Sequence, residues 1–169
     1  MREITVSDAA LRKAAEEGMD TFIGVFTDAL HQAVGEELTT ATIQELNADQ
    51  VTLMAWETLH REVMDGGFVQ LIHNGYGPFI FKNPFAKALN KLWHMRELSK
   101  MVYEAHTLYA KYGAEIEKDC TDEEFMMLFE RFPEFEDLDD QFVENEEEYT
   151  AQVAGYIDEN IQKFASIVA

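Results

Sequence analysis

Residues 115–159 read EIEKDCTDEEFMMLFERFPEFEDLDDQFVENEEEYTAQVAGYIDE. This acidic stretch holds eighteen Asp and Glu residues but only two bases, Lys118 and Arg131. Aromatic and aliphatic residues recur between the acids, whereas disordered acidic tails lack enough apolar surface to offset the entropy of the chain. The stretch is therefore predicted to be folded protein with a negatively charged surface.

Capping patterns divide the acidic stretch into helices. Thr121 and Glu124 have the spacing of a capping box, which predicts a helix that Pro133 ends. Asn145 and Glu148 have the same spacing and predict the last helix. Between these two helices we expect a short acidic connector with one helical turn.

Helical periodicity also dominates residues 1–114, and no segment shows the sustained alternation of a strand. The sequence therefore predicts an all-α fold, as a single compact helical domain of about six to eight helices over residues 1–169 with an acidic C-terminal half. The helices expected before the acidic stretch are 8–17, 20–38, 47–63, 68–73, and a helix from Pro84 to Gly113 with a break near Trp93. Ser7 or Asp8 is expected to cap the first of them. Asn47 and Gln50 are expected to open the helix 47–63, and Gly66 and Gly67 to stop it.

The net charge of −20 is unevenly distributed along the chain. Residues 115–169 hold 18 acids and 3 bases, a net −15, and residues 1–114 hold 15 acids and 10 bases, a net −5. This field disfavours direct binding to nucleic acid or to an anionic membrane, and it favours a basic protein surface. There is no membrane-spanning apolar run, no apolar signal-peptide core and only one cysteine, so we expect a cytoplasmic protein.

The sequence offers little catalytic chemistry. Glu57 and His60 form a Glu-x-x-His pair, but di-iron bundles need two such pairs, and no second pair is present. The single cysteine, Cys120, lies between Asp119 and Asp122, whose charges hinder thiolate formation. We expect no enzymatic activity, no cofactor and no metal, and we read the Glu57–His60 pair as an incidental surface pair. A metal-binding enzyme that uses these two residues is the alternative.

Two interpretations of the acidic surface follow from physics alone. Acids in the first turn of a helix interact favourably with its dipole, by about 0.3–1 kcal/mol each, and acids improve solubility. Neither effect requires the acids between Glu134 and Glu144, where no base occurs over eleven residues. A solvated acidic face and a dedicated surface for a basic partner both remain open at this stage.

One motif resembles that of a known family. Residues 62–74 read EVMDGGFVQLIHN, a glutamate followed by Gly-Gly-Phe and then by spaced Gln and Asn. This pattern resembles the core motif of the small acidic bacterial DNA-mimic family, and the size, the helical pattern and the acidity are similar too. The resemblance implies a helical and often dimeric protein whose carboxylates imitate DNA phosphates. It also implies a partner of the helix-turn-helix transcription-factor type, which would be released from its operator.

The leading hypothesis is a non-enzymatic regulator that presents acids to the DNA-binding face of a basic partner. An immunity-type inhibitor of a basic nuclease toxin would use the same acids and is the alternative binding role. A homodimer is plausible under either hypothesis. The acids expected to make the contact are Glu134, Glu136, Asp137, Asp139, Asp140, Glu144, Glu146, Glu147 and Glu148, with Asp119, Asp122 and Glu123 as a flank.

Overall fold

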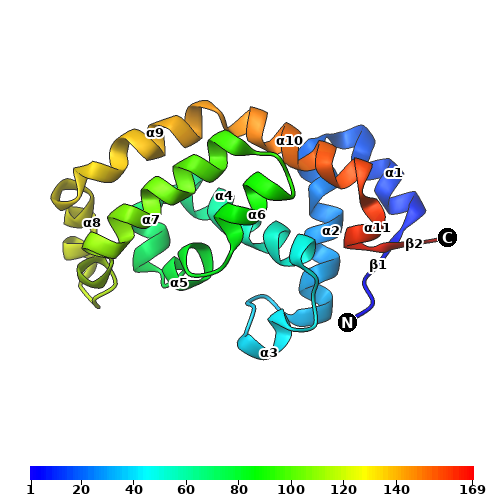
Figure 1. Ribbon diagram of the computed structural model, residues 1–169, viewed down its shortest axis with the longest axis horizontal. Coiled ribbons are helices and arrows are strands. Elements are labelled where there is room, and N and C mark those ends of the chain that lie inside the picture. Colours follow the sequence, from blue (N-terminus) through cyan, green and yellow to red (C-terminus); the bar gives the residue numbers. More distant parts are fainter. The chain divides into compact units, whose positions relative to one another are not determined.

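Helices account for most of the chain in the computed structural model, which describes all residues from Met1 to Ala169 (Figure 1). The only strands are β1 (Thr5–Ser7) and β2 (Ser166–Val168), which pair in parallel. The all-α prediction is therefore confirmed. None of the helices combines the length and the apolar content that crossing a membrane requires.

The contacts within the chain define two compact units. The terminal unit consists of residues 1–54 and 147–169, and the central unit of residues 55–146. The organisation of residues 1–169 as a single domain stays a prediction.

The terminal unit forms around helices whose ends the sequence specifies. Its helices are α1 (Asp8–Glu17), α2 (Met19–Val34), α3 (Thr40–Ile43), the first part of α4 (Ala48–His73), most of α10 (Glu146–Glu159), and α11 (Ile161–Phe164). Ser7 caps α1 by accepting a hydrogen bond from the backbone N–H of Ala10. Asn47 and Gln50 form the predicted capping box, with backbone-to-side-chain distances of 2.8 and 2.9 Å. These two predicted helix starts are confirmed.

Buried contacts join the two ends of the chain within the terminal unit. The side-chain amide of Gln50 donates to the carbonyl of Phe164 at 2.8 Å, in the core. The hydroxyl of Tyr156 donates to Oδ1 of Asp49 at 2.8 Å, and burial together with this carboxylate raises the pKa of Tyr156. The N-terminal end of α4 is thereby fixed to α10 and α11.

The central unit contains the acidic helices and a set of apolar ones. Its aromatic core includes Phe68, Phe135 and Phe142, which are almost fully buried. The elements are the remainder of α4, α5 (Gly77–Phe81), α6 (Phe85–Lys91), α7 (Arg96–Ile116), α8 (Asp122–Arg131), the 3-10 helix η1 (Pro133–Phe135) and α9 (Glu136–Glu144).

Several predicted boundaries differ from the structure. The helix expected over residues 20–38 ends at Val34, because Gly35 has a φ of +92°. Gly113 does not end α7, which continues to Ile116 while Gly113 packs closely against the ring of Tyr109. The expected acidic connector is almost wholly helical, as η1 and α9. The helices α1 to α11 outnumber the six to eight expected, because short turns such as α3, α5 and α11 form separate helices.

Helix α4 is interrupted at Gly67, the second glycine of the Gly-Gly-Phe motif. The residue has φ +78° and ψ −177°, so the backbone is non-helical there, and helix resumes from Phe68 to His73. A Cβ atom on Gly67 would overlap the carboxylate of Asp139. Only glycine satisfies both the positive φ and this close approach without strain.

We predict that Gly67→Ala destabilises the protein more than Gly75→Ala does. Gly75 also has a positive φ, +90°, but nothing lies within 4 Å of its missing Cβ. Gly75→Ala should therefore incur only the backbone strain, about 1–2 kcal/mol, whereas Gly67→Ala must also displace Asp139. Urea unfolding monitored by circular dichroism measures both variants. Equal losses would mean that the contact with Asp139 does not constrain the kink.

Candidate functional site

Helix α9 separates its side chains into a buried face and an acidic face. Leu138 and Phe142 are buried, as is Phe135 just before the helix. Residues three or four apart share one side of a helix, so the remaining acids fall on the side away from the core. Four exposed acids lie there and are termed the acidic row: Glu136, Asp137, Asp140 and Glu144.

The acidic row is not neutralised within the chain. None of its four carboxylates takes part in an ion pair, and no base occurs between Glu134 and Glu144. Neighbouring side chains at this spacing are about 5–6 Å apart. The row therefore presents several negative charges at short and regular intervals on a folded helix.

Asp139 is on the same helix but points into the protein. Its Oδ1 accepts the backbone N–H of Phe68 at 2.8 Å, at the point where α4 resumes after the Gly67 kink. Burial, together with the nearby charges of Asp140 and Glu136, raises the pKa of Asp139 to about 7, although the Phe68 N–H acts in the opposite direction. Asp139 thus serves as a hydrogen-bonding anchor of α9.

The sequence pattern predicts Asp139 among the partner-binding acids and does not predict this anchoring role. The signal was present in the spacing, because residues 135, 138, 139 and 142 fall on one side of a helix. Stacking adds to the anchor: the rings of Phe68 and Phe135 are 6.4 Å apart at an angle of 27°. Helix α9 is therefore held to the kinked part of α4 at two adjacent points.

The remaining motif residues support the kink from the other side. Glu62 is buried, and its carboxylate accepts the side-chain amides of Gln70 at 2.7 Å and Asn74 at 3.2 Å. These hydrogen bonds tie the helix before Gly67 to the helix after it. The Glu, Gly-Gly-Phe, Gln and Asn pattern therefore specifies a backbone arrangement, because its polar side chains bond to one another across the kink.

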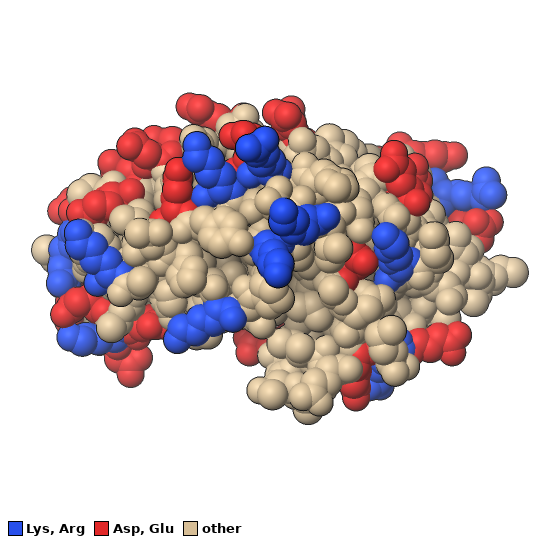
Figure 2. Space-filling model, viewed as in Figure 1, with Lys and Arg blue, Asp and Glu red and all other residues tan.

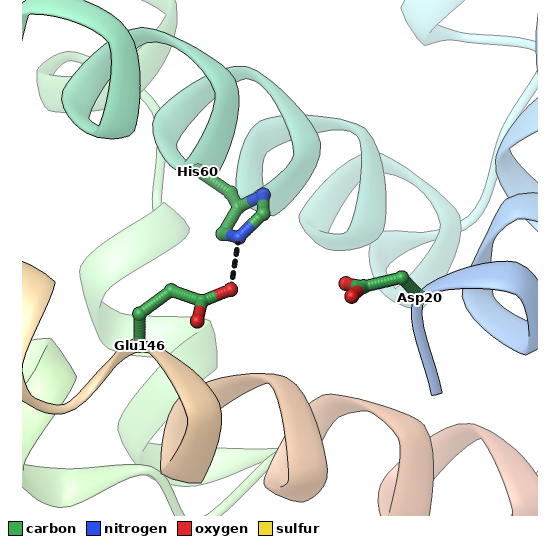
Figure 3. A group of neighbouring side chains, drawn as sticks. All are labelled: Asp20, His60 and Glu146. Carbon is green, nitrogen blue, oxygen red and sulfur yellow. Dashed lines mark hydrogen bonds and ion pairs between the residues drawn. The ribbon is translucent and has the colours of Figure 1, made fainter. Parts of the chain in front are cut away.

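The other predicted acids fall into two groups. Glu146 is half-buried, and its Oε1 accepts Nε2 of His60 at 2.7 Å (Figure 3). His60 is also half-buried, with its ring next to Trp56, so the expectation of an incidental surface pair with Glu57 does not describe it. The exposed group comprises Glu134 in η1, Asp119 before α8, Asp122 and Glu123 in the first turn of α8, and Glu147 and Glu148 in the first turn of α10 in the terminal unit.

The two capping patterns of the acidic stretch behave differently. Thr121 accepts the backbone N–H of Glu124 at 3.2 Å, which starts α8. Asn145 differs, because its side-chain amide donates to the carbonyl of Gln141 at 2.8 Å and so satisfies the end of α9. The acid-bearing helices α8 and α9 thus have at least one side-chain cap each.

Charged side chains of both signs are visible on the surface of the central unit. In the view of Figure 2, acidic side chains gather along the upper left edge, where α9 runs, and Lys and Arg side chains lie over α6 and α7, some of them beside acidic ones (Figures 1 and 2). The acidic edge agrees with the exposed positions of the acidic row.

Comparison with known proteins gives two matches. The family described as DMP19-like protein matches residues 44–160. A protein named DNA mimic protein DMP19, from Neisseria meningitidis serogroup B (strain MC58), is 38% identical over 123 residues, which cover 72% of this chain and 74% of that protein. Residues 44–160, which the family matches, include the kink motif and the acidic row.

We predict that Asp139→Asn makes stability less dependent on pH. The pKa of Asp139 in the folded protein, about 7, lies above its ordinary value of 3.8, so the folded state retains a proton that the unfolded state has lost. Stability from this group is therefore present below pH 4 and is lost as pH rises through 7. Asparagine keeps an acceptor for Phe68 N–H without this titration. Urea unfolding at pH 5, 6, 7 and 8 should give a flatter profile for Asp139→Asn than for the unmodified chain.

Asp139→Ala provides the matched comparison. It removes the acceptor and leaves the N–H of Phe68 unpaired, which should lower the free energy of unfolding by about 1–3 kcal/mol relative to Asp139→Asn. Parallel pH profiles for Asp139→Asn and the unmodified chain would show that Asp139 does not titrate in this range.

Proposed function

Because the chain belongs to the DMP19-like protein family, we propose that it acts as a DNA mimic, whose acidic surface occupies the DNA-binding face of a protein partner and excludes DNA from it. The acidic row on α9 is the observation that carries this proposal. Its four exposed carboxylates have no ion-pair partner in the chain and share one side of an anchored helix. The proposed role is binding, without catalysis or a cofactor.

The spacing of the acids supports imitation of phosphates. Duplex DNA carries about one negative charge per 1.7 Å of its axis, counting both strands. Carboxylates three or four residues apart on a helix are about 5–6 Å apart, and Glu134 with the acids of α8 can supply further charges beside the row. A protein whose Lys and Arg residues are arranged to bind phosphates would meet charges at comparable intervals.

Rigidity distinguishes the acidic row from a disordered acidic tail. A flexible tail would lose conformational entropy on binding, whereas α9 is already fixed by the Asp139 hydrogen bond and the Phe68–Phe135 stacking. The arrangement therefore favours binding without a large ordering cost. Asp139 and Glu146 accept hydrogen bonds from within the protein, so neither belongs to the proposed contact.

The proposed partner is a basic DNA-binding protein, more specifically a helix-turn-helix transcription factor. Charge attraction would accelerate the encounter, and the complex would weaken as salt rises, because both partners exchange counterions on binding. A nuclease toxin would be recognised through the same row, so the activity of the captured partner separates the two roles. Dimerisation and a cytoplasmic location stay predictions.

We expect neutralisation of the acidic row to weaken partner binding by about tenfold or more, which corresponds to about 1.4 kcal/mol or more. The variant is Glu136→Gln, Asp137→Asn, Asp140→Asn and Glu144→Gln. A matched control removes four exposed acids of the terminal unit, by Glu16→Gln, Glu17→Gln, Glu36→Gln and Glu37→Gln, and should bind nearly as the unmodified chain does. Both variants lose four negative charges, so the comparison separates position from net charge.

The measurement begins with capture of partners from a bacterial lysate on the immobilised chain at low salt. Duplex DNA and salt are then used separately for elution, and the eluted protein is purified for binding titrations. DNA should release the partner and the row variant should fail to capture it. A partner that stays bound in excess duplex DNA would contradict DNA mimicry.

A further inference from the structure

The central unit carries a basic face that the charge of the whole chain conceals. Six of the thirteen Lys and Arg residues occur between Gly75 and Ala114, where the only acids are Glu97 and Glu104. This segment therefore has a local net charge of +4 in a protein of −20. The six bases are Lys82, Lys87, Lys91, Arg96, Lys100 and Lys111.

The bases of this segment are exposed and free of carboxylate partners. None of the six forms an ion pair within the chain. Lys87 and Lys91 are four residues apart on α6, and Arg96 and Lys100 are four residues apart on α7, so each pair shares one side of its helix. These four residues are termed the basic face.

The basic face is hollowed where α7 begins. Arg96 and Lys100 line an open hollow of about 630 Å³, together with Asn90 and the half-exposed ring of Tyr103. Glu97 and Glu104 also line the hollow, but neither pairs with a base there. Figure 2 shows Lys and Arg side chains over α6 and α7, and acidic side chains along the upper left edge over α9.

We propose that the basic face is a second contact surface, which binds an acidic surface of the same protein partner whose DNA-binding face takes the acidic row. This inference rests on the proposed function and adds a basis for selectivity. The two surfaces belong to one compact unit, α6 and α7 pack against each other, and α7 also contacts η1 next to α9. The two surfaces are therefore carried by connected elements of one unit, and the proposal is that one partner contacts both.

Positive charge is the electrostatic feature that duplex DNA cannot present. A row of acids alone would attract many proteins that bind DNA, because all of them carry Lys and Arg for phosphates. A basic face adds attraction only for a partner with acids at the matching position, and it repels a partner that is basic there. The face would thus select one DNA-binding protein among many.

The charge of the chain favours carboxylates of a protein over phosphates of a nucleic acid as the ligand. Duplex DNA is a long and densely charged rod, so it would be repelled by the acids of α8 and α9 in the same unit. An acidic patch on a protein is limited in extent and can approach the basic face alone. The screening length of about 8 Å at physiological salt permits this local attraction.

The test uses a basic-face variant, Lys87→Gln, Lys91→Gln, Arg96→Gln and Lys100→Gln. Removing these four positive charges changes the net charge from −20 to −24. A general attraction to a basic partner would then become stronger, whereas loss of a real contact would make binding weaker. The two explanations therefore predict changes of opposite sign.

A matched control replaces Arg2, Arg12, Lys13 and Lys163 by glutamine. These four residues all belong to the terminal unit, and the control variant has the same net charge of −24. For the purified captured partner, we expect the basic-face variant to bind about tenfold more weakly than the unmodified chain, and the control to bind at least as tightly. For poly-lysine, which has no carboxylates, both variants should bind at least as tightly as the unmodified chain.

A poly-glutamate peptide makes the test independent of the partner. At physiological ionic strength, where repulsion from the distant acids is screened, the labelled peptide should bind the unmodified chain and the acidic-row variant, and the basic-face variant should lose this binding by about tenfold. Equal peptide binding by the unmodified chain and the basic-face variant would overturn the inference. So would direct binding of labelled duplex DNA that only the basic-face variant loses, because the face would then recognise phosphates.

The outcomes separate this inference from the proposed function. If the acidic-row variant still captures the partner and DNA does not compete, the proposed function fails. If the acidic-row variant loses the partner but the basic-face variant binds it as the unmodified chain does, only the second contact surface fails.

Discussion

The hydrogen bond from the backbone N–H of Phe68 to Asp139 is the interaction on which the central unit depends. It satisfies a donor that the kink at Gly67 removes from the helical pattern, and it joins α4 to the helix that carries the acidic row. The Glu62 hydrogen bonds hold the two sides of the kink together. A motif whose polar side chains hydrogen-bond to one another thereby determines where the exposed acids are presented.

This anchor has an energetic consequence for a highly charged protein. Exposed carboxylates at short intervals repel one another. The pKa of Asp139 is raised mainly by burial and also by the charges of its neighbours Asp140 and Glu136. Packing of Phe135, Leu138 and Phe142 compensates on the opposite side of η1 and α9. Burial of these apolar side chains thus offsets the loss of stability that repulsion within the acidic row causes.

The proposed roles of the acidic row and the basic face follow from their unpaired charges. The acidic row and the basic face have no ion pairs in the chain, so each retains its full attraction for an external group. The ion pairs that do form around α8 are exposed ones, between Glu115 and Lys118 or Arg131, and such pairs contribute little to stability. Unpaired charges of both signs are therefore available for recognition, one for the DNA-like character and the other for the choice of partner.

The sequence by itself determined the helical class, the caps at Ser7, Asn47 and Thr121, and the family, because capping and periodicity are local properties that neighbouring residues fix. Only the tertiary structure decided which acids are exposed. Asp139 and Glu146 read as surface acids in the sequence, yet Phe68 and His60, about seventy to ninety residues away, engage them. The exposure of a carboxylate depends on what packs against its helix, and a run of acids does not contain that information.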